Sequence, residues 1–420
     1  MVNKKDILEL KRRFKKEECT FTRMCGCYVD AGKEKLVKFN ESFLNLEDEE
    51  FYKYLEIAKK ALSGNLGNNL LELSFPLEEE AAGGKQQFFL ALRESKLKNE
   101  DLLDRFYDLV IENYEYAGNY LILLFHDAYD VMTKTNDNLK LDESEEVFEY
   151  LLCAICPVCL SKPGLGYLAD ENRIGPRIRD WVVSVPETGI LFPTFSDRST
   201  DIHSVTYYVR DPKDSRADFV ENALGCGSKR TATEQKQVFH AVVKKALAPI
   251  ADNDDEILLD IQESIQNRLD SSEEAALSDE AVSIPLTSAL ISEVLAENEI
   301  PDSAASEIRD SLEEYFGDEL PPMKNVIDEK TLENNAKLKK EQSLVEQVDE
   351  LKRELVEKSF SEQAAEDEQS GVVATYDVIL RVKPEKANQI KAQTVDGHKC
   401  LLIPMEDNEY VNVNGINTKL

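Results

Sequence analysis

The sequence predicts an α+β protein, because segments with strand-like alternation and segments with helical spacing are interspersed along its 420 residues. The first third orders these segments as strand, helix, strand, helix and strand. The acidic stretch after residue 250 is helical, and the end of the chain alternates again. We therefore expect an N-terminal α/β domain with a mixed sheet at 1–134, a central β-rich segment with a closing helix at 147–250, an acidic helical or linker region at 251–370 and a small C-terminal β module at 371–420.

The first domain is expected to begin with a short basic helix at 4–16, followed by a hairpin. TFTRMCGCYVD alternates up to a turn at Asp30-Ala31-Gly32, and KEKLVKF then supplies the second strand. The alternation places Cys25 and Cys27 on one face, where two thiols are more typical of a core than of a ligand pair.

The rest of the first domain alternates between the two kinds of element. The expected bounds are a helix at 46–62, a strand at 70–77, a loop EEEAAGGKQQ at 78–87, a helix at 86–114 that breaks near Lys98-Asn99, and a strand at 118–132. His126 on the last strand is expected to be a hydrogen-bonded core or edge histidine. The acidic residues 135–146 then lead out of the domain as a loop.

Residues 148–212 form the least charged long stretch and include the single tryptophan, Trp181, which predicts the most buried part of the chain. Strands are predicted in VFEYLLCAICPV, VVSV, GILF and SVTYYVR. An amphipathic helix at 232–250 closes the segment.

Residues 251–370 are strongly acidic and weakly apolar, which favours a linker or solvated helices. Within them, residues 286–322 have the pattern of two helices divided at Pro301. Further on, a charged helix carries a short apolar stripe, which favours docking on the protein's own surface over a partner helix. The stripe consists of Leu344, Val348, Leu351 and Leu355.

Residues 371–420 are expected to form hairpins. Asp396-Gly397 and Asn414-Gly415 lie between alternating apolar runs and supply the positive φ that tight turns require. TYDVILRVKP, at 375–384, provides a further strand.

The formal charge of −32 is concentrated in the second part of the chain. Residues 1–250 carry 34 basic and 42 acidic side chains, whereas residues 251–420 carry 16 and 40. Such a field repels phosphates, so any RNA contact should use the first 250 residues, and no DNA partner is expected. The sequence has neither an apolar run of about 18 residues nor a secretion signal, which predicts a cytoplasmic protein with reduced cysteines and no membrane contact.

Cys153, Cys156 and Cys159 lie three residues apart in CAICPVC, and thiolates at this spacing can converge on one ion. A closed zinc site needs a fourth ligand, and an iron–sulfur cluster needs further cysteines, but the other cysteines are distant in sequence. We therefore predict no cofactor, with zinc or an iron–sulfur cluster as the alternative. Without a metal, these thiols would fill a buried strand.

Ser199, Asp201 and His203 alternate in SDRSTDIHS, a pattern that resembles a hydrolytic triad. Alternate strand residues, however, point in parallel about 6–7 Å apart, whereas the groups of a triad hydrogen-bond one another. A polar turn is therefore the favoured interpretation. Because Walker, GxGxxG and HExxH patterns are also missing from the sequence, no catalytic residue is predicted and an enzyme is not favoured.

The most basic part of the centre is NRIGPRIRDW, which holds Arg173, Arg177 and Arg179. Pairing with neighbouring acids is one interpretation, and contact with an anion or a phosphate is the other.

Several segments resemble an uncharacterised bacterial family, domain-of-unknown-function family 4317. They are TRMCGCYVD, GGKQQFFLALRESKL, EYLLCAICP, FPTFSDRSTDIHS and VDGHKCLLIP with the later VNGI. The resemblance extends over nearly the full length and implies no assigned activity.

Residues 69–131 also resemble the central domain of the eukaryotic and archaeal class I peptide-release factors and of Pelota. Gly83 and Gly84 match the two glycines of the Gly-Gly-Gln tip, but Lys85 occupies the glutamine position and Gln86 follows one residue late. The resemblance implies a ribosome-binding factor for rescue or hibernation, without peptidyl-tRNA hydrolysis. Its nucleic-acid contacts would be these four residues together with the central arginines.

These observations together predict a non-enzymatic binding or regulatory protein whose partner is the ribosome or another protein. In its sharpest form it is a ribosome-associated factor that uses the Gly83-Gly84 loop and the central arginines. The alternative is a metal-binding or redox protein built on Cys153, Cys156 and Cys159.

Overall fold

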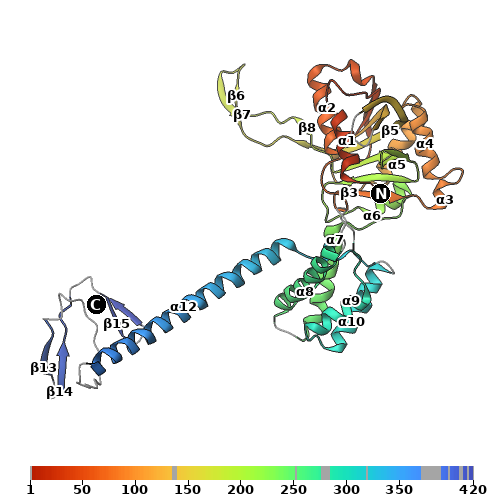
Figure 1. Cartoon of the computed structure of the whole chain (residues 1–420). Coiled ribbons are helices and arrows are strands. Elements are labelled where there is room, and N and C mark those ends of the chain that lie inside the picture. The colour runs from red at the N-terminus through yellow and green to blue at the C-terminus, as the bar shows by residue number, and fades with distance from the viewer. Residues whose placement is uncertain are drawn as a thin grey trace. The chain divides into compact units, whose positions relative to one another are not determined.

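The computed structural model describes residues 2–134, 140–250, 253–275, 284–317, 320–369, 389–395, 398–405, 410–413 and 416–419. The chain forms two compact units, residues 1–334 and 335–420. The first unit combines an antiparallel sheet, helices on both faces of that sheet and a helical bundle, so the fold is α+β (Figure 1).

The sheet of the first unit has the strand order β2-β1-β4-β5-β9-β12-β3, with β8 paired to the end of β5. The strands are β1 Arg23–Val29, β2 Lys35–Glu41, β3 Leu70–Ser74, β4 Asn119–Lys134, β5 Lys140–Leu160, β8 Trp181–Val183, β9 Thr188–Phe192 and β12 Ser204–Val209. All pairs between these strands are antiparallel. The order of elements in the sequence predicts a mixed sheet, and this detail of the prediction is wrong. The reason is that β3 pairs with the distant β12 and not with its neighbours in sequence.

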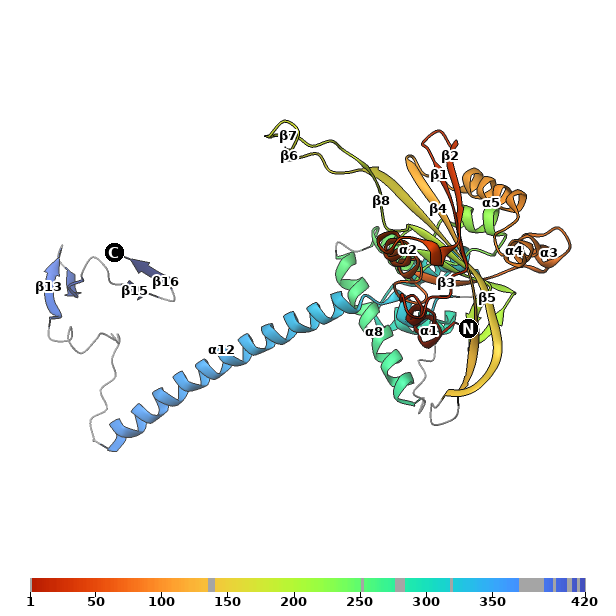
Figure 2. The same ribbon diagram turned by 90° about the horizontal axis from the view of Figure 1, so that it is seen from above.

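Alternation along the strands divides the apolar side chains between two cores, one on each face. Cys25 and Cys27 lie together on one face, as predicted, and pack with α4 (Lys85–Glu94) and α5 (Glu100–Asn113). The opposite face packs with α1 (Lys4–Arg13) and α2 (Asp48–Lys60). Figure 2 shows α1 and α2 on one side of the sheet and α4 and α5 on the other.

The segment 78–87, expected as a loop, is helical at both ends. α3 (Leu77–Glu80) follows Pro76, where glutamates suit the first turn of a helix, and α4 begins at Lys85. The break expected near Lys98-Asn99 is confirmed, because the Asn99 side chain caps α5 by accepting from the Leu102 N–H at 3.1 Å.

The acidic residues 135–146 are not simply a loop, because β5 already begins at Lys140. β4 and β5 pair along most of their length and as far as Lys134 opposite Lys140. Residues 1–134 and 147–250 therefore contribute strands to one sheet, and the boundary expected between them falls within a hairpin.

Residues 161–185 leave the sheet as an arm, although their low charge predicts burial (Figure 1). The arm contains a ribbon of β6 (Leu165–Leu168) and β7 (Arg173–Pro176), and it returns to the sheet through β8. Trp181 has 56% of its surface exposed. The prediction of burial is confirmed for β9, β12 and the inner part of β5, but it is wrong for the arm.

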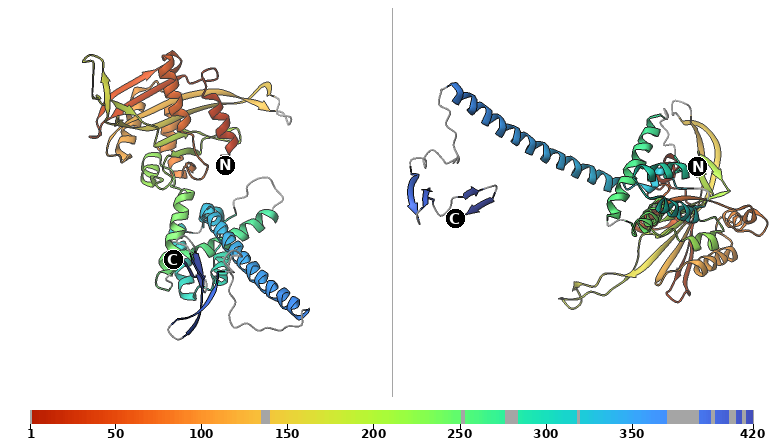
Figure 3. Two further views of the ribbon diagram at one scale, coloured as in Figure 1. Left: turned by 90° about the vertical axis from the view of Figure 1, so that its left-hand side faces the viewer. Right: turned by 90° about the horizontal axis from the view of Figure 1, so that it is seen from below.

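A helical bundle follows the sheet, and Figure 3 shows its first helix passing from the sheet into it. The bundle contains α7 (Ala232–Leu247), α8 (Asp254–Ala275), α9 (Ser288–Glu297), α10 (Asp302–Phe316) and α11 (Met323–Val326). The predicted division at Pro301 is confirmed. The region is helical as expected, but up to residue 334 it is a packed bundle and not a linker. Its core includes Leu258, Ile261, Ile265 and Leu269, whose helical spacing makes one apolar face within a charged segment.

The second unit contains most of α12 (Glu329–Gln369) and two hairpins. Leu344, Val348 and Leu351 of the apolar stripe are exposed on α12, and the docking of this stripe stays a prediction. The side chain of Leu355 lies outside the described residues.

The two hairpins near the end of the chain are confirmed. β13 (Lys391–Val395) pairs with β14 (His398–Leu402), and β15 (Tyr410–Val413) pairs with β16 (Ile416–Lys419). The further strand expected at 375–384 and the four turn residues lie outside the described residues.

Candidate functional site

The arm carries the three arginines predicted to contact an anion. Arg173 pairs with Glu171, and Nε of Arg179 donates to the carbonyl oxygen of Ser161 at 2.7 Å. Within the described chain, neither Arg177 nor Lys162 forms an ion pair with a carboxylate. Residues 161–185 hold four basic and three acidic side chains, so the arm has a small positive charge in a chain of −32.

Large apolar side chains are exposed along the same arm. They are Leu165, Tyr167, Ile174, Ile178, Trp181, Val182, Val183 and Val185. A two-stranded ribbon alone is only marginally stable in water, and exposed apolar groups gathered in one region are a common feature of binding surfaces, which makes the arm a candidate site.

The Gly83-Gly84 loop joins α3 to α4 and is fixed by contacts within the protein. Gly83 has a φ of +94°, a backbone conformation that favours glycine. A Cβ atom on Gly84 would lie 2.2 Å from the main-chain oxygen of Glu79, so a side chain does not fit there. The N–H of Lys85 donates to the Glu79 carboxylate at 2.6 Å, which fixes the start of α4.

Gln86 faces the protein interior. Its side chain is 2% exposed, and Nε2 donates to the carbonyl oxygen of Ile202 at 3.0 Å. A Gly-Gly-Gln tip would need an amide that faces a partner, and Gln86 does not provide one.

The loop and the arm do not form one surface. Figures 1 and 2 both show α3 and α4 on the side of the sheet away from β6 and β7. The predicted contacts at 83–86 are therefore separated from Arg173, Arg177 and Arg179.

Cys153, Cys156 and Cys159 do not converge. Cys153 belongs to the core under α4 and α5, Cys156 belongs to the core under α1 and α2, and Cys159 is exposed. A step of three residues along a strand reverses the face, which explains the separation. Burial raises the pKa of Cys156 to about 12 and holds that of Cys153 well above its usual range, so both are thiols at neutral pH. The described residues contain no group of three or more His, Cys, Asp and Glu side chains placed to hold a metal ion.

The side chains of Ser199, Asp201 and His203 do not hydrogen-bond one another and form no triad. Ser199 Oγ donates to Glu146 at 3.0 Å, and His203 Nδ1 lies 2.8 Å from Oε1 of Glu80. Asp201 accepts from the main-chain N–H of His203 at 3.0 Å, so the polar-turn interpretation is confirmed. The hydrogen bond to Glu80 raises the pKa of His203.

His126 is a hydrogen-bonded core histidine, as predicted. Its Nδ1 lies 2.6 Å from the Thr22 hydroxyl oxygen, and its Nε2 lies 2.8 Å from Oε1 of Glu149. Burial lowers the pKa of His126 despite this carboxylate, so the ring serves the packing of β4.

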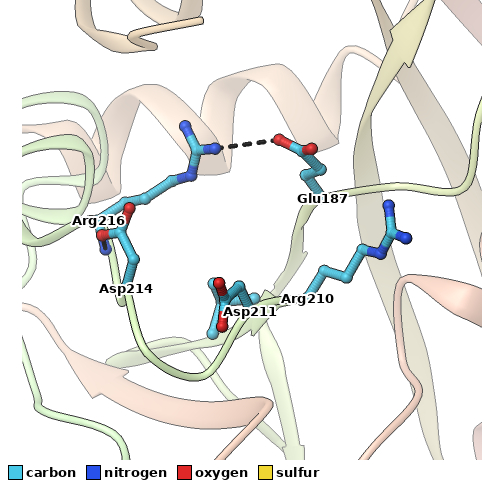
Figure 4. A pocket seen from close by; sticks show the side chains of 6 residues that line it. Glu187, Arg210, Asp211, Asp214 and Arg216 are labelled. Carbon is cyan, nitrogen blue, oxygen red and sulfur yellow. Dashed lines mark hydrogen bonds and ion pairs between the residues drawn. The ribbon is translucent and has the colours of Figure 1, made fainter. Parts of the chain in front are cut away.

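A polar pocket of about 440 Å³, which the sequence patterns did not reveal, lies beside the ends of β9 and β12 (Figure 4). It is lined by Glu187, Val209, Arg210, Asp211, Asp214 and Arg216. Arg216 and Glu187 face each other across it, with 3.0 Å between Nη2 and Oε2. The guanidinium of Arg216 also lies 4.6 Å from the centre of the Tyr114 ring.

The acidic side chains of this pocket hold its own loop. Asp211 accepts from the N–H of Lys213, and Asp214 accepts from the N–H of Arg216, both at 3.0 Å. The Asp-Pro and Asp-Ser pairs of this segment are turn signals, but nothing local connects them to Glu187. Asp211 and Asp214 thus stabilise the loop at 210–216. The described residues that line the pocket include no serine, threonine, cysteine or lysine that could act as a nucleophile.

Comparison with known proteins identifies a family that covers nearly the whole chain. The family model described as "Domain of unknown function (DUF4317)" matches residues 2–416. No curated protein matches the chain. Among the described helices, none has the length and apolar character needed to cross a membrane.

Proposed function

The chain belongs to the DUF4317 family, whose function is unknown, and we therefore propose a function from the contacts of its own residues. The protein is a non-enzymatic binding protein whose arm, residues 161–185, contacts the ribosome. The observation that supports this proposal is the arm itself, where the exposed Tyr167 and Trp181 accompany Lys162 and Arg177, two cations that form no ion pair with any residue the structure describes.

A ribosome presents phosphates, unstacked bases and apolar protein groups, and the arm carries side chains suited to each. Arginine binds phosphate oxygens through its planar guanidinium, and aromatic side chains stack on exposed bases. The 40 acidic against 16 basic side chains of residues 251–420 oppose phosphate contacts there, which favours contact through the arm in the first part of the chain.

The proposal differs from the sequence-based hypothesis at the Gly83-Gly84 loop. Gln86 is buried, and Lys85 is bound by Glu79 through its main chain. We therefore assign the ribosome contact to the arm and propose no peptidyl-tRNA hydrolysis.

Co-sedimentation of the full chain with ribosomes tests the proposal. The triple variant Arg173→Ala/Arg177→Ala/Arg179→Ala should bind at least about tenfold more weakly, and its affinity should fall less steeply with salt because fewer phosphates are neutralised. The matched control is Lys324→Ala/Lys330→Ala/Lys337→Ala, which removes three exposed cations from α11 and α12. Ribosome binding that is absent from the wild type, or equally weakened in both variants, would refute the role of the arm.

A further inference from the structure

A second pocket, of about 400 Å³, lies at the start of α7, where the chain passes from the sheet to the bundle. Lys213, Lys229 and Arg230 line it together with Ser228, whose hydroxyl donates to the Glu221 carboxylate. These residues come from two loops, one after β12 and one before α7, so no single sequence motif contains them.

The cations of this pocket have no acidic partner in the described part of the chain. Glu234 is the acidic residue of the lining, and its two oxygens accept the N–H groups of Ser215 at 2.7 Å and Thr231 at 2.8 Å. Nζ of Lys229 donates to the main-chain oxygen of Glu72 at 2.7 Å, which leaves its charge uncompensated. Three such cations in one pocket stand out in a chain with a net charge of −32.

The main chain adds hydrogen-bond donors beside these side chains. Among the described residues, no protein group accepts from the main-chain N–H of Ser228, Lys229 or Arg230. In the first turn of α7, by contrast, these donors are already satisfied, because the Glu234 N–H donates to the Thr231 hydroxyl at 3.0 Å and the Ala232 N–H donates to the main-chain oxygen of Gly67 at 2.9 Å. Consecutive free N–H groups beside lysine and arginine side chains are donors that phosphate oxygens use in proteins.

We propose that this pocket binds the phosphate groups of a small molecule. Three cations match the charge of a diphosphate better than that of a single carboxylate, and the volume of the pocket suits a small ligand. Arg230 also donates to the main-chain oxygen of Tyr315, and its guanidinium lies 5.4 Å from the centre of the Phe316 ring of α10. A ligand held by Arg230 would therefore connect the sheet to the bundle and raise the temperature of unfolding.

Calorimetric titration of the full chain with inorganic pyrophosphate tests the site. We expect saturable binding of one pyrophosphate per chain, weakened at least about tenfold in Lys213→Ala/Lys229→Ala because two charge-assisted contacts are lost. The Lys229→Ala change also removes the contact of Lys229 with Glu72 and could disturb the fold. The single variant Lys213→Ala leaves that contact in place, and its pyrophosphate affinity should also decrease. Lys213→Arg should retain binding within about threefold, and the control Lys324→Ala/Lys330→Ala should match the wild type.

The outcomes separate this site from the proposed function of the arm. Lys213→Ala should lose pyrophosphate affinity while it co-sediments with ribosomes like the wild type. Absence of saturable binding, or equal weakening in the control, would overturn the site. Reduced co-sedimentation of Lys213→Ala, together with competition by an RNA oligonucleotide, would overturn the assignment to a small molecule and indicate an RNA contact.

Discussion

The arm and the helical bundle hold their apolar side chains in opposite ways. In the bundle, residues such as Ile261 and Ile308 from different helices meet in one core and are shielded from water. In the arm, residues such as Tyr167 and Ile174 are exposed on a ribbon of two short strands. The difference indicates that the bundle is stabilised by its own contacts, whereas the apolar side chains of the arm gain little from burial within the chain, as the proposed contact with a partner requires.

This difference depends on how many apolar faces of an element are covered by neighbouring elements. Each bundle helix has an apolar stripe and neighbours that cover it, so every helix gains free energy from the others. A ribbon that projects from a sheet has two broad faces and no neighbouring layer. The following substitutions test whether the comparison holds, beginning with the largest expected effect.

Ile308→Ala should lower the free energy of unfolding by about 2–5 kcal/mol, because it leaves a cavity in the bundle core. Ile308 is fully buried on α10, with 0% of its surface exposed. Urea denaturation of the full chain, followed by circular dichroism, measures the change. A loss below about 1 kcal/mol would mean that the bundle is not a close-packed core.

Ile178→Ala makes the same chemical change on the arm and serves as the matched comparison. Because Ile178 is 78% exposed, the free energy of unfolding should change by no more than about 0.5 kcal/mol. The same variant should bind ribosomes more weakly in co-sedimentation, since apolar contacts of the arm are then lost. A large loss of stability would instead show that the arm packs on the protein itself.

The smallest expected effect concerns pH and the bundle residue His240. Burial lowers its pKa below the ordinary 6.5, and its Nε2 lies 3.1 Å from the carbonyl oxygen of Val326. The His240 imidazole therefore binds a proton at a higher pH in the unfolded chain than in the folded chain. As a result, the free energy of unfolding should decrease as the pH falls below about 6.5. Lys236, Lys244 and Asp328 surround the ring. His240→Gln should flatten the pH dependence of the unfolding midpoint between pH 7.5 and 5.5, and an unchanged slope would exclude His240 as its source.

Much of the fold follows from local signals in the sequence. The hairpin of β1 and β2 follows from its alternation and the turn at Asp30-Ala31-Gly32, and the division between α9 and α10 follows from Pro301. The pairing of β3 with β12 has no local signal, because it depends on which strand edges remain open after the rest of the sheet has formed.

The candidate sites are less predictable, because they depend on residues that only the fold brings together. The arginines at 173, 177 and 179 were recognisable by their charge, and the structure exposes them on the arm. The spacing of Cys153 and Cys156 suggested convergence, but on a strand it places them on opposite faces. Lys213 and Lys229 share a pocket from two different loops, so neither segment alone reveals it.

The order of the strands also determines when the sheet can be completed during protein synthesis. β3 ends at Ser74, but its partner β12 begins only at Ser204. A translating ribosome adds about 5–20 residues per second, so β12 follows β3 after roughly 7–25 seconds. In that interval β1, β2 and β4 become available to one another, while β3 stays an open edge on the nascent chain. Polysomes that crowd several nascent copies together would therefore leave β3 open to misassembly for longer than β1, whose second partner β4 begins at Asn119.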